Sequence, residues 1–160
     1  DLPTILVALD AEIAARGPEG DRAIPAAEFF RGLFETALGQ CDVVTEIRVP
    51  KLGTWKGWSY IKFNRRAQDW ATVAVAAIVR REDGTVDEAA VALTNMGTTP
   101  LRGRAVEQAL AGASVDSVAQ AAEQAAEGTS PPSDTNGSAE YRRHLATVLV
   151  RRALEEAISG

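Results

Sequence analysis

Two apolar segments joined by a tight turn constrain the fold of this chain more than any other feature. Residues 73–80 and 86–94 flank the pair Asp83 and Gly84. An Asp-Gly pair between apolar runs is a strong hairpin signal, because both residues tolerate the positive φ angles that the turn requires. Aromatic residues recur along the preceding segment, residues 58–64. We therefore expect three strands that pair in one antiparallel sheet.

The segment from Gly57 to Ala71, GWSYIKFNRRAQDWA, gathers aromatic and charged residues just ahead of the apolar hairpin. Alternate side chains of a strand share a face, so Trp58, Tyr60 and Lys62 are expected to point to one side. A lysine beside aromatic rings suits a flat, partly anionic ligand. The same arrangement also arises when a lysine stem packs over a core aromatic residue, so both interpretations stay open.

Composition limits the functions that this chain can have. Its 160 residues, 46% of them hydrophobic, are enough to bury a core. The net charge of -5 and the pI near 5.0 do not fit a nucleic-acid-binding protein, which normally carries a basic excess. A single cysteine and a single histidine exclude an internal disulfide and a zinc or iron–sulfur constellation within the chain. No apolar run approaches the ~20 residues that cross a bilayer.

The N-terminal part is predicted to combine short helices with antiparallel strands. Asp1 is a favoured N-cap, and Pro3 is tolerated in a first helical turn. A chain that begins on a helix cap is expected to be cut from something longer, so the missing signal peptide indicates little about compartment. The predicted elements are a helix at 3–9, strands at 12–16 and 22–24, a helix at 26–30, and a strand near a sheet edge at 43–49.

Residues 51–57, KLGTWKG, are predicted to connect two subdomains, with Trp55 packed against a neighbouring surface. Three helices are predicted after the strands, which makes the fold class α+β. Gly112 is the predicted C-cap of the first, and Ser114 and Ser138 are the predicted N-caps of the others. The helices are expected at 103–110, from 115 to before Gly128, and from 138 to about 158. The predicted buried stripes are Val115, Val118, Ala119, Ala122 and Ala125 in the second helix, and Tyr141, Leu145, Val148, Leu149 and Ala153 in the last.

Six segments follow one another in a characteristic order along nearly the whole chain. They are DLPTILVALDAEI, RAIPAAEFF, DVVTEIRVP, YIKFNRRAQDWATVAVAA, TTPLRGRAVEQAL and DTNGSAEYRRHLATVLVRRAL. Each segment alone is only weakly specific. Their joint order and spacing resemble the FAD-binding medium subunit of the molybdenum hydroxylases, as in aerobic carbon monoxide dehydrogenase.

This resemblance implies two domains: the end of a flavin-binding subdomain at 1–52, and the C-terminal domain of the medium subunit at 57–160. The second domain is expected to hold a three-stranded antiparallel sheet packed on a three-helix bundle, with Arg142 and Arg152 serving packing and docking. In the family, glycine-rich segments resembling AGGxS and TIGGN cradle the flavin pyrophosphate through backbone amides. The chain contains neither segment, so we expect FAD in the full-length subunit but not on this chain alone.

The resemblance also implies three flavin contacts. Asp1 matches the aspartate that accepts hydrogen bonds from the ribityl chain, although it can equally be a plain N-cap. Val44 matches an aliphatic residue whose backbone lies against the isoalloxazine ring, and the alternative is an inner-sheet valine. Lys62 matches a lysine near the flavin, where a fixed cation stabilises negative charge on the reduced ring. No catalytic or metal-binding residue is predicted.

Other polar residues are expected to have structural roles. Arg65, Arg66 and Asp69 are predicted to form salt bridges that tie a loop to the sheet. His144 has no acidic or nucleophilic partner in evident reach, and we expect it at the surface or in packing. Cys41 lies in a predicted loop without a histidine motif and is expected to be an ordinary thiol.

The function implied by the resemblance is electron transfer within a cytoplasmic oxidoreductase, which would lie at the inner face of the membrane only through its partners. A large subunit would carry the molybdenum cofactor, and a small subunit would carry 2Fe-2S clusters. FAD on the medium subunit would collect the electrons and pass them to an external acceptor such as a quinone. The alternative is a non-catalytic docking module for the iron–sulfur subunit. A stand-alone enzyme has little support, because no nucleophile, base and orienting group can be assembled from the motifs.

Overall fold

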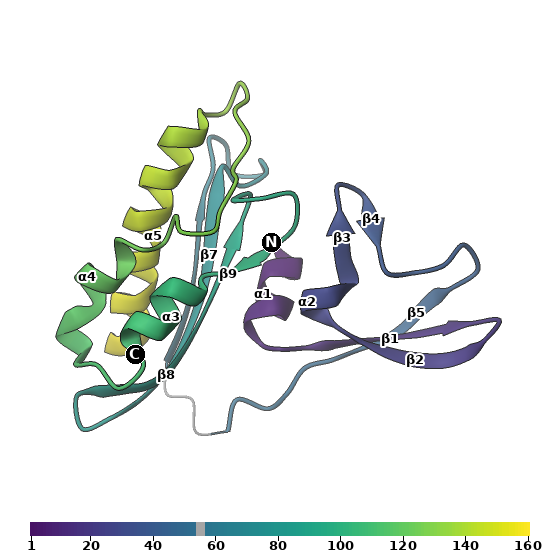
Figure 1. Ribbon diagram of the computed structural model, residues 1–160, viewed down its shortest axis with the longest axis horizontal. Helices are drawn as coiled ribbons and strands as arrows, with labels where there is room; N and C mark the ends of the chain where they lie inside the picture. The colour runs from purple at the N-terminus through teal and green to yellow at the C-terminus, as the bar shows by residue number, and fades with distance from the viewer. Residues whose placement is uncertain (54–56) are drawn as a thin grey trace.

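A four-stranded antiparallel sheet forms the centre of the molecule (Figure 1). The computed structural model describes residues 1–53 and 57–160. The sheet contains β6 (Gly57–Phe63), β7 (Val73–Glu82), β8 (Thr85–Thr94) and β9 (Leu101–Arg102), in the order β6-β7-β8-β9. The three predicted strands are therefore present, but the three-stranded description is incomplete. The sequence analysis missed β9 because two residues are too short to show an alternating pattern.

The β7–β8 hairpin turns at the predicted pair. Asp83 has a φ of 47° and Gly84 a φ of 76°, and Glu82 pairs with Thr85 on either side of them. Two positive φ angles in a two-residue loop match the twist of the flanking strands. The predicted subdomain connection lies partly outside the described residues, and so does the predicted packing of Trp55.

Helices cover one face of this sheet (Figure 1). They are α3 (Arg104–Leu110), the 3-10 turn η1 (Val115–Ser117), α4 (Val118–Ala122) and α5 (Ala139–Ser159). Ser114 caps η1 and Ser138 caps α5 through their side-chain oxygens, as predicted. The predicted single helix from 115 to before Gly128 is wrong at both ends, since it begins as a tighter 3-10 turn and the α-helix ends at Ala122, with turns after it. That change of pitch rotates the buried side, so Ala121 is buried and Ala119 is exposed.

The long helix α5 buries a stripe that differs from the predicted one at its N-terminal end. Leu145, Leu149 and Ala153 are buried as predicted, but Tyr141 is 42% exposed. Arg142 takes the buried position instead and is 0% exposed. Its guanidinium can be buried because it donates hydrogen bonds to a backbone carbonyl and a carboxylate, as described below.

The N-terminal part contains a three-stranded sheet and a small ribbon beside it (Figure 1). Strand β5 is an edge strand of the sheet order β2-β1-β5, as predicted. The sequence analysis missed the β3–β4 ribbon, whose tip exposes Leu33 and Phe34. The elements are α1 (Leu2–Ala8), β1 (Glu12–Gly17), β2 (Gly20–Pro25), α2 (Ala26–Phe29), β3 (Phe30–Gly32), β4 (Glu35–Thr36) and β5 (Val43–Arg48).

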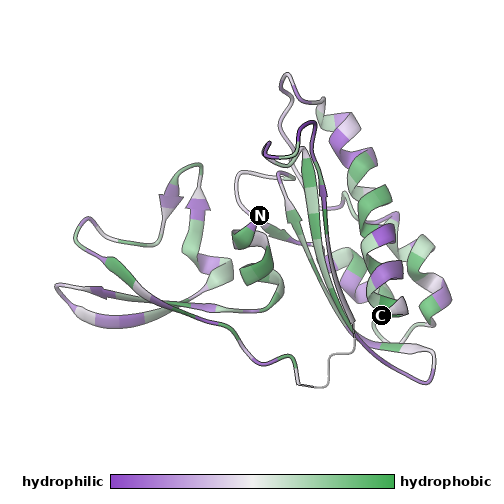
Figure 2. Cartoon of the chain, turned by 180° about the vertical axis from the view of Figure 1, so that it is seen from behind, coloured by the Kyte–Doolittle hydropathy of each residue, from purple (hydrophilic) through white to green (hydrophobic). Residues whose placement is uncertain are grey.

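Both faces of the β7–β8 hairpin are buried. Val75, Ala77 and Val79 belong to a hydrophobic core shared with α3, α4 and α5. Ala76 and Ile78, which alternate with them, belong to a second core shared with α1, α2, β1 and β2. Figure 2 shows hydrophobic residues along these central strands. The hairpin therefore joins the N-terminal part to the helical layer, and its small residues let α1 approach closely.

A partly buried ionic network reinforces this junction. The Arg102 guanidinium lies 2.6 Å from Oε1 of Glu107 on α3 and 2.9 Å from Oδ1 of Asp10, which follows α1. Glu107 Oε1 also accepts the backbone N–H of Val91 at 2.9 Å. Burial alone would lower the pKa of Arg102, but its bonds to the two carboxylates outweigh burial and raise the pKa. The network thus ties the C-terminal sheet to both α1 and α3.

Replacing Glu107 with alanine should destabilise the protein by about 3 kcal/mol, because Arg102 and the Val91 N–H lose a shared acceptor in a site shielded from water. Urea unfolding followed by circular dichroism measures this loss. The matched control is Asp21→Ala, which removes an exposed ion pair with Arg16 and should leave the midpoint unchanged. Equal effects of the two substitutions would contradict the role assigned to Glu107.

Candidate functional site

An open groove of about 530 Å³ lies where the N-terminal part meets one end of the central sheet. Its walls come from the start of α1, the β3–β4 ribbon, the end of β8 and three loops of the C-terminal part, which are the β6–β7 loop, the β8–β9 loop and the loop before α5 (Figure 1). Of the described residues that line the groove, Asp1 is the only charged one. Leu33 and Trp70 line it while being 73% and 88% exposed, so the walls are largely apolar at the surface. Such a groove suits a ring with a polar extension.

Asp1, Tyr60 and Lys62 meet at the edge of this groove. The Tyr60 hydroxyl donates to Oδ1 of Asp1 at 3.0 Å, and the Lys62 ammonium donates to Oδ2 at 2.7 Å. On the opposite face of β6, Ser59 donates to Glu156 of α5 at 2.8 Å. The predicted alternation thus sends Tyr60 and Lys62 towards α1 and Ser59 towards the helical layer.

The carboxylate of Asp1 is held by one neutral and one charged donor. Lys62 is 25% exposed and Asp1 is 45% exposed, so the ion pair is partly shielded from water. Burial raises the pKa of Tyr60, and a hydrogen bond with Thr94 only partly opposes this, so the phenol stays protonated at neutral pH. Thr94 and Thr4 hydroxyls lie 2.5 Å apart and connect the end of β8 to α1.

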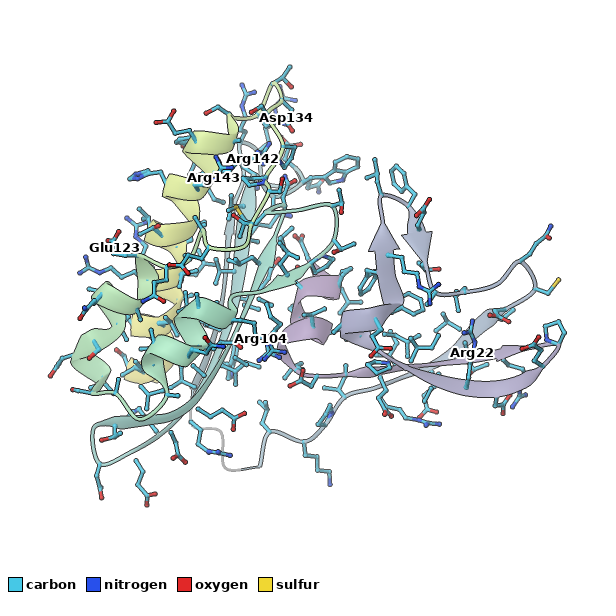
Figure 3. All side chains as sticks on the ribbon, viewed as in Figure 1. Arg22, Arg104, Glu123, Asp134, Arg142 and Arg143 are labelled. Carbon is cyan, nitrogen blue, oxygen red and sulfur yellow. The ribbon has the colours of Figure 1, made fainter. Side chains whose placement is uncertain are left out.

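One wall of the groove is braced by the buried Arg142 and by partly exposed polar groups. Arg142 reaches from α5 to the carbonyl of Thr72 and to Asp134, 2.6 Å away, as Figure 3 shows for Arg142 and Asp134. Asn95 donates its amide to the carbonyls of Ala71 and Thr72, at 3.0 and 3.3 Å. These bonds hold the backbone that follows Trp70, and so they set the position of the groove wall.

The structure brings two of the three predicted flavin contacts together. Asp1 lines the groove, and the Lys62 ammonium donates a hydrogen bond to the Asp1 carboxylate, although 61 positions separate the two residues. Val44 lies on β5, is 40% exposed and does not line the groove. The alternative interpretation of Val44 as an inner-sheet valine is therefore wrong, because β5 is an edge strand.

The predicted salt bridges of the loop after β6 are not present. In the part of the chain that the structure describes, Arg65, Arg66 and Asp69 form no ion pair, and the N–H of Asp69 instead donates to the Arg66 carbonyl at 3.0 Å. Arg65 and Arg66 are exposed and Asp69 is partly buried, and exposed charges gain little from pairing. His144 and Cys41 are exposed, the former on α5 and the latter in a loop.

Sequence analysis missed Tyr60 as a partner of Asp1 and missed the polar groups that brace the wall. Tyr60 appeared only as a member of an aromatic row, and Asn95 and Thr94 appeared only at the end of a strand. Their contacts join segments between 23 and 90 positions apart, so local patterns could not show them. Among residues 1–53 and 57–160, no cluster of histidine, cysteine or carboxylate side chains could hold a metal ion. The same residues contain no helix with the length and apolarity needed to cross a membrane.

Two protein families match the two parts of the chain. The family described as CO dehydrogenase flavoprotein C-terminal domain matches residues 58–157. The family described as FAD binding domain in molybdopterin dehydrogenase matches residues 1–52. This chain belongs to the FAD-binding medium subunits of the molybdenum hydroxylases.

Relatives of this medium-subunit chain include the carbon monoxide dehydrogenase medium chain of Hydrogenophaga pseudoflava, 36% identical over 98% of this chain and 55% of the relative. The glyceraldehyde dehydrogenase medium chain of Sulfolobus acidocaldarius is 34% identical over 98% of this chain and 56% of the relative. This chain thus spans about half the length of these relatives.

Solved structures share the fold closely. A carbon monoxide dehydrogenase from Hydrogenophaga pseudoflava superposes with a TM-score of 0.93 at 38% identity, over 99% of this chain and 56% of that one. Quinoline 2-oxidoreductase from Pseudomonas putida gives a TM-score of 0.92 at 27% identity, over 100% of this chain and 56% of that one. The mixed α and β architecture is therefore the one found in medium subunits of this family.

Replacing Asp134 with asparagine should destabilise the protein at neutral pH but not in strong acid. Hydrogen bonds from the Asn136 N–H and from Arg142 hold the pKa of Asp134 below its usual value of 3.8. The stability that this carboxylate contributes is present above pH 3.8 and is lost as pH falls through the lowered pKa. The difference in melting temperature between wild type and Asp134→Asn should therefore be present at neutral pH and disappear as the pH falls through the lowered pKa of Asp134. A control, Asp69→Asn, changes an aspartate that forms no ion pair within residues 1–53 and 57–160 and should alter the melting temperature little. A difference for Asp134→Asn that stays constant with pH would contradict this assignment.

Proposed function

We propose that this chain forms the ring-facing and ribityl-facing part of the FAD site in the medium subunit of a molybdenum-containing dehydrogenase similar to carbon monoxide dehydrogenase. In this role the subunit carries electrons from the iron–sulfur clusters of a small subunit, through FAD, to an external acceptor. The observation that supports this proposal most directly is the contact of Asp1 with Lys62 at the edge of an open groove. In a chain of this family, these are two residues that the resemblance assigns to the flavin.

The groove fits one half of FAD better than the other. Its apolar walls and its single carboxylate suit a flavin ring with its ribityl hydroxyls. A pyrophosphate needs cations or a cradle of backbone amides, whereas the only charged side chain among the described residues that line the groove is the carboxylate of Asp1, and the sequence contains no glycine-rich phosphate segment. We therefore infer that the rest of the subunit supplies the pyrophosphate site, and that this chain alone does not hold FAD.

Asp1 and Lys62 would have different roles towards the cofactor. A carboxylate offers about four lone-pair positions, and Tyr60 and Lys62 occupy two of those of Asp1, so the others can accept hydrogen bonds from polyol hydroxyls. Lys62 places a partly shielded positive charge beside the groove, which favours negative charge on a bound ring. Bound FAD would supply the redox chemistry itself. Val44 remains a predicted contact through its backbone.

The division of the chain at residues 1–52 and 57–160 is part of the same proposal. The first segment would complete a flavin-binding subdomain, and the second would be a C-terminal domain. A large subunit with the molybdenum cofactor and a small subunit with 2Fe-2S clusters are the proposed partners. We also propose that the assembly is cytoplasmic and reaches the inner face of the membrane only through those partners.

The proposed dependence on the rest of the subunit is tested by adding FAD to two proteins. One is this chain, and the other is the completed medium chain, in which this chain is joined to the part of the Hydrogenophaga pseudoflava relative that it does not match. We expect a shifted, saturable flavin absorption band only with the completed medium chain, studied in complex with its partner subunits. A saturable band with this chain alone would refute the proposal that the phosphate site lies elsewhere.

Replacing Lys62 with alanine in the completed medium chain separates the flavin role from the alternative docking role. Loss of a charge-assisted contact should weaken FAD binding about tenfold while the complex still assembles. Arg65→Ala is the matched control, because Arg65 is an exposed cation on the following loop and forms no ion pair in the described part of the chain. Failed assembly with Lys62→Ala, measured by size-exclusion chromatography, would instead support the docking module.

A further inference from the structure

The two tyrosines of the chain lie in different environments. Tyr60 is partly buried against the core around α1, and its hydroxyl donates to Asp1. Tyr141 is 42% exposed, and no hydrogen bond of its hydroxyl is found among the described residues. A buried phenol usually has a specific partner. The partner of Tyr60 is a residue that the proposed function assigns to the cofactor.

We propose that Tyr60 is a positioning residue for the flavin site: its hydroxyl holds the Asp1 carboxylate in the orientation in which Lys62 binds one oxygen and the remaining lone pairs face the groove. This inference rests on the proposed function of Asp1 and Lys62. It adds a residue that would act on the cofactor only through Asp1.

The geometry explains why a second donor is needed. Lys62 has a flexible four-carbon stem, so a single bond to its ammonium leaves the carboxylate free to rotate. Tyr60 and Lys62 are two positions apart on the same face of β6, and each binds a different oxygen of Asp1. Two-point attachment from one strand restricts that rotation. The flavin hydroxyls would then meet an acceptor that is already oriented.

The neutrality of the tyrosine donor also matters. The side-chain charges of Asp1 and Lys62 cancel, and the phenol of Tyr60 adds no charge to this cluster. A second cation in place of Tyr60 would leave a net positive charge beside the ring. Burial keeps Tyr60 protonated, because it raises the pKa of the phenol.

Tyr60 is itself held firmly. Its backbone pairs with Ala76 of the inner strand β7, and its ring packs against the core around α1. The Thr4–Thr94 contact joins α1 to the end of β8 beside it. The hydroxyl therefore projects from a rigid element towards the helix that begins next to Asp1, as a positioning group requires.

The experiment replaces Tyr60 with phenylalanine in the completed medium chain, assembled with its partners, and measures the FAD dissociation constant. Loss of a hydrogen bond to a charged group should weaken binding about tenfold. Tyr141→Phe removes the other phenolic hydroxyl and should leave the constant unchanged. An unchanged constant for Tyr60→Phe would overturn the inference.

A double-mutant cycle shows whether Tyr60 acts through Asp1. In an Asp1→Asn background, the effect of Tyr60→Phe on FAD affinity should largely disappear, because the group that it orients has changed. An undiminished effect would overturn the positioning role, since a purely structural loss would add independently. A crystal structure of the Tyr60→Phe protein should show the Asp1 carboxylate rotated or disordered, and an unchanged carboxylate would also count against the inference.

The single substitutions distinguish this inference from the proposed function. If Asp1→Asn and Lys62→Ala both leave FAD affinity unchanged, the flavin site lies elsewhere and the proposed function itself fails. If those two variants weaken binding and Tyr60→Phe does not, only the positioning role fails.

Discussion

Burial of both faces of the β7–β8 hairpin is the constraint on which the rest of the structure depends. One set of alternating side chains packs under the helices α3, α4 and α5, and the other packs under α1 and its neighbours. A strand buried on both sides cannot shift its register without moving a whole set of side chains into the wrong core. The two parts of the chain are therefore held in one relative position, and the groove at their junction has defined walls.

The candidate site follows from that packing. Because β6 pairs with β7, its alternate residues Tyr60 and Lys62 face the side where α1 lies, while Ser59 faces α5. The docking of α1 on the hairpin brings Asp1 to the same edge of the sheet. A charged pair formed across the junction of two packing units is a suitable place to bind a cofactor, since both units must be correctly assembled before the pair exists. Hydrogen bonds of the buried Arg142 and the partly buried Asn95 then hold the backbone after Trp70 that lines the groove.

Much of the architecture could be predicted from local patterns. The Asp83-Gly84 hairpin, the serine caps and the long final helix all have signals within a few residues, and all are present. The errors arise where the physical cause is not local. Strand β9 and the strands of the β3–β4 ribbon are too short for periodicity, and β9 forms by pairing with the long strand β8. The burial of Arg142 could not be predicted, because one of its acceptors, the carbonyl of Thr72 just before β7, lies 70 positions away in the sequence.

The amino-acid sequence by itself determined the family, the α+β class and the identity of two residues expected at the flavin, because order of motifs, hydrophobic period and turn chemistry are properties of neighbouring residues. Only the tertiary structure decided that Asp1 and Lys62 touch, that Tyr60 shares their contact, and that the charges of the loop after β6 form no ion pair with any other described residue. Those facts depend on how α1 packs against a sheet more than 60 positions away. Contacts across such separations depend on how the two hydrophobic cores pack against each other, and patterns among neighbouring residues do not reveal that packing.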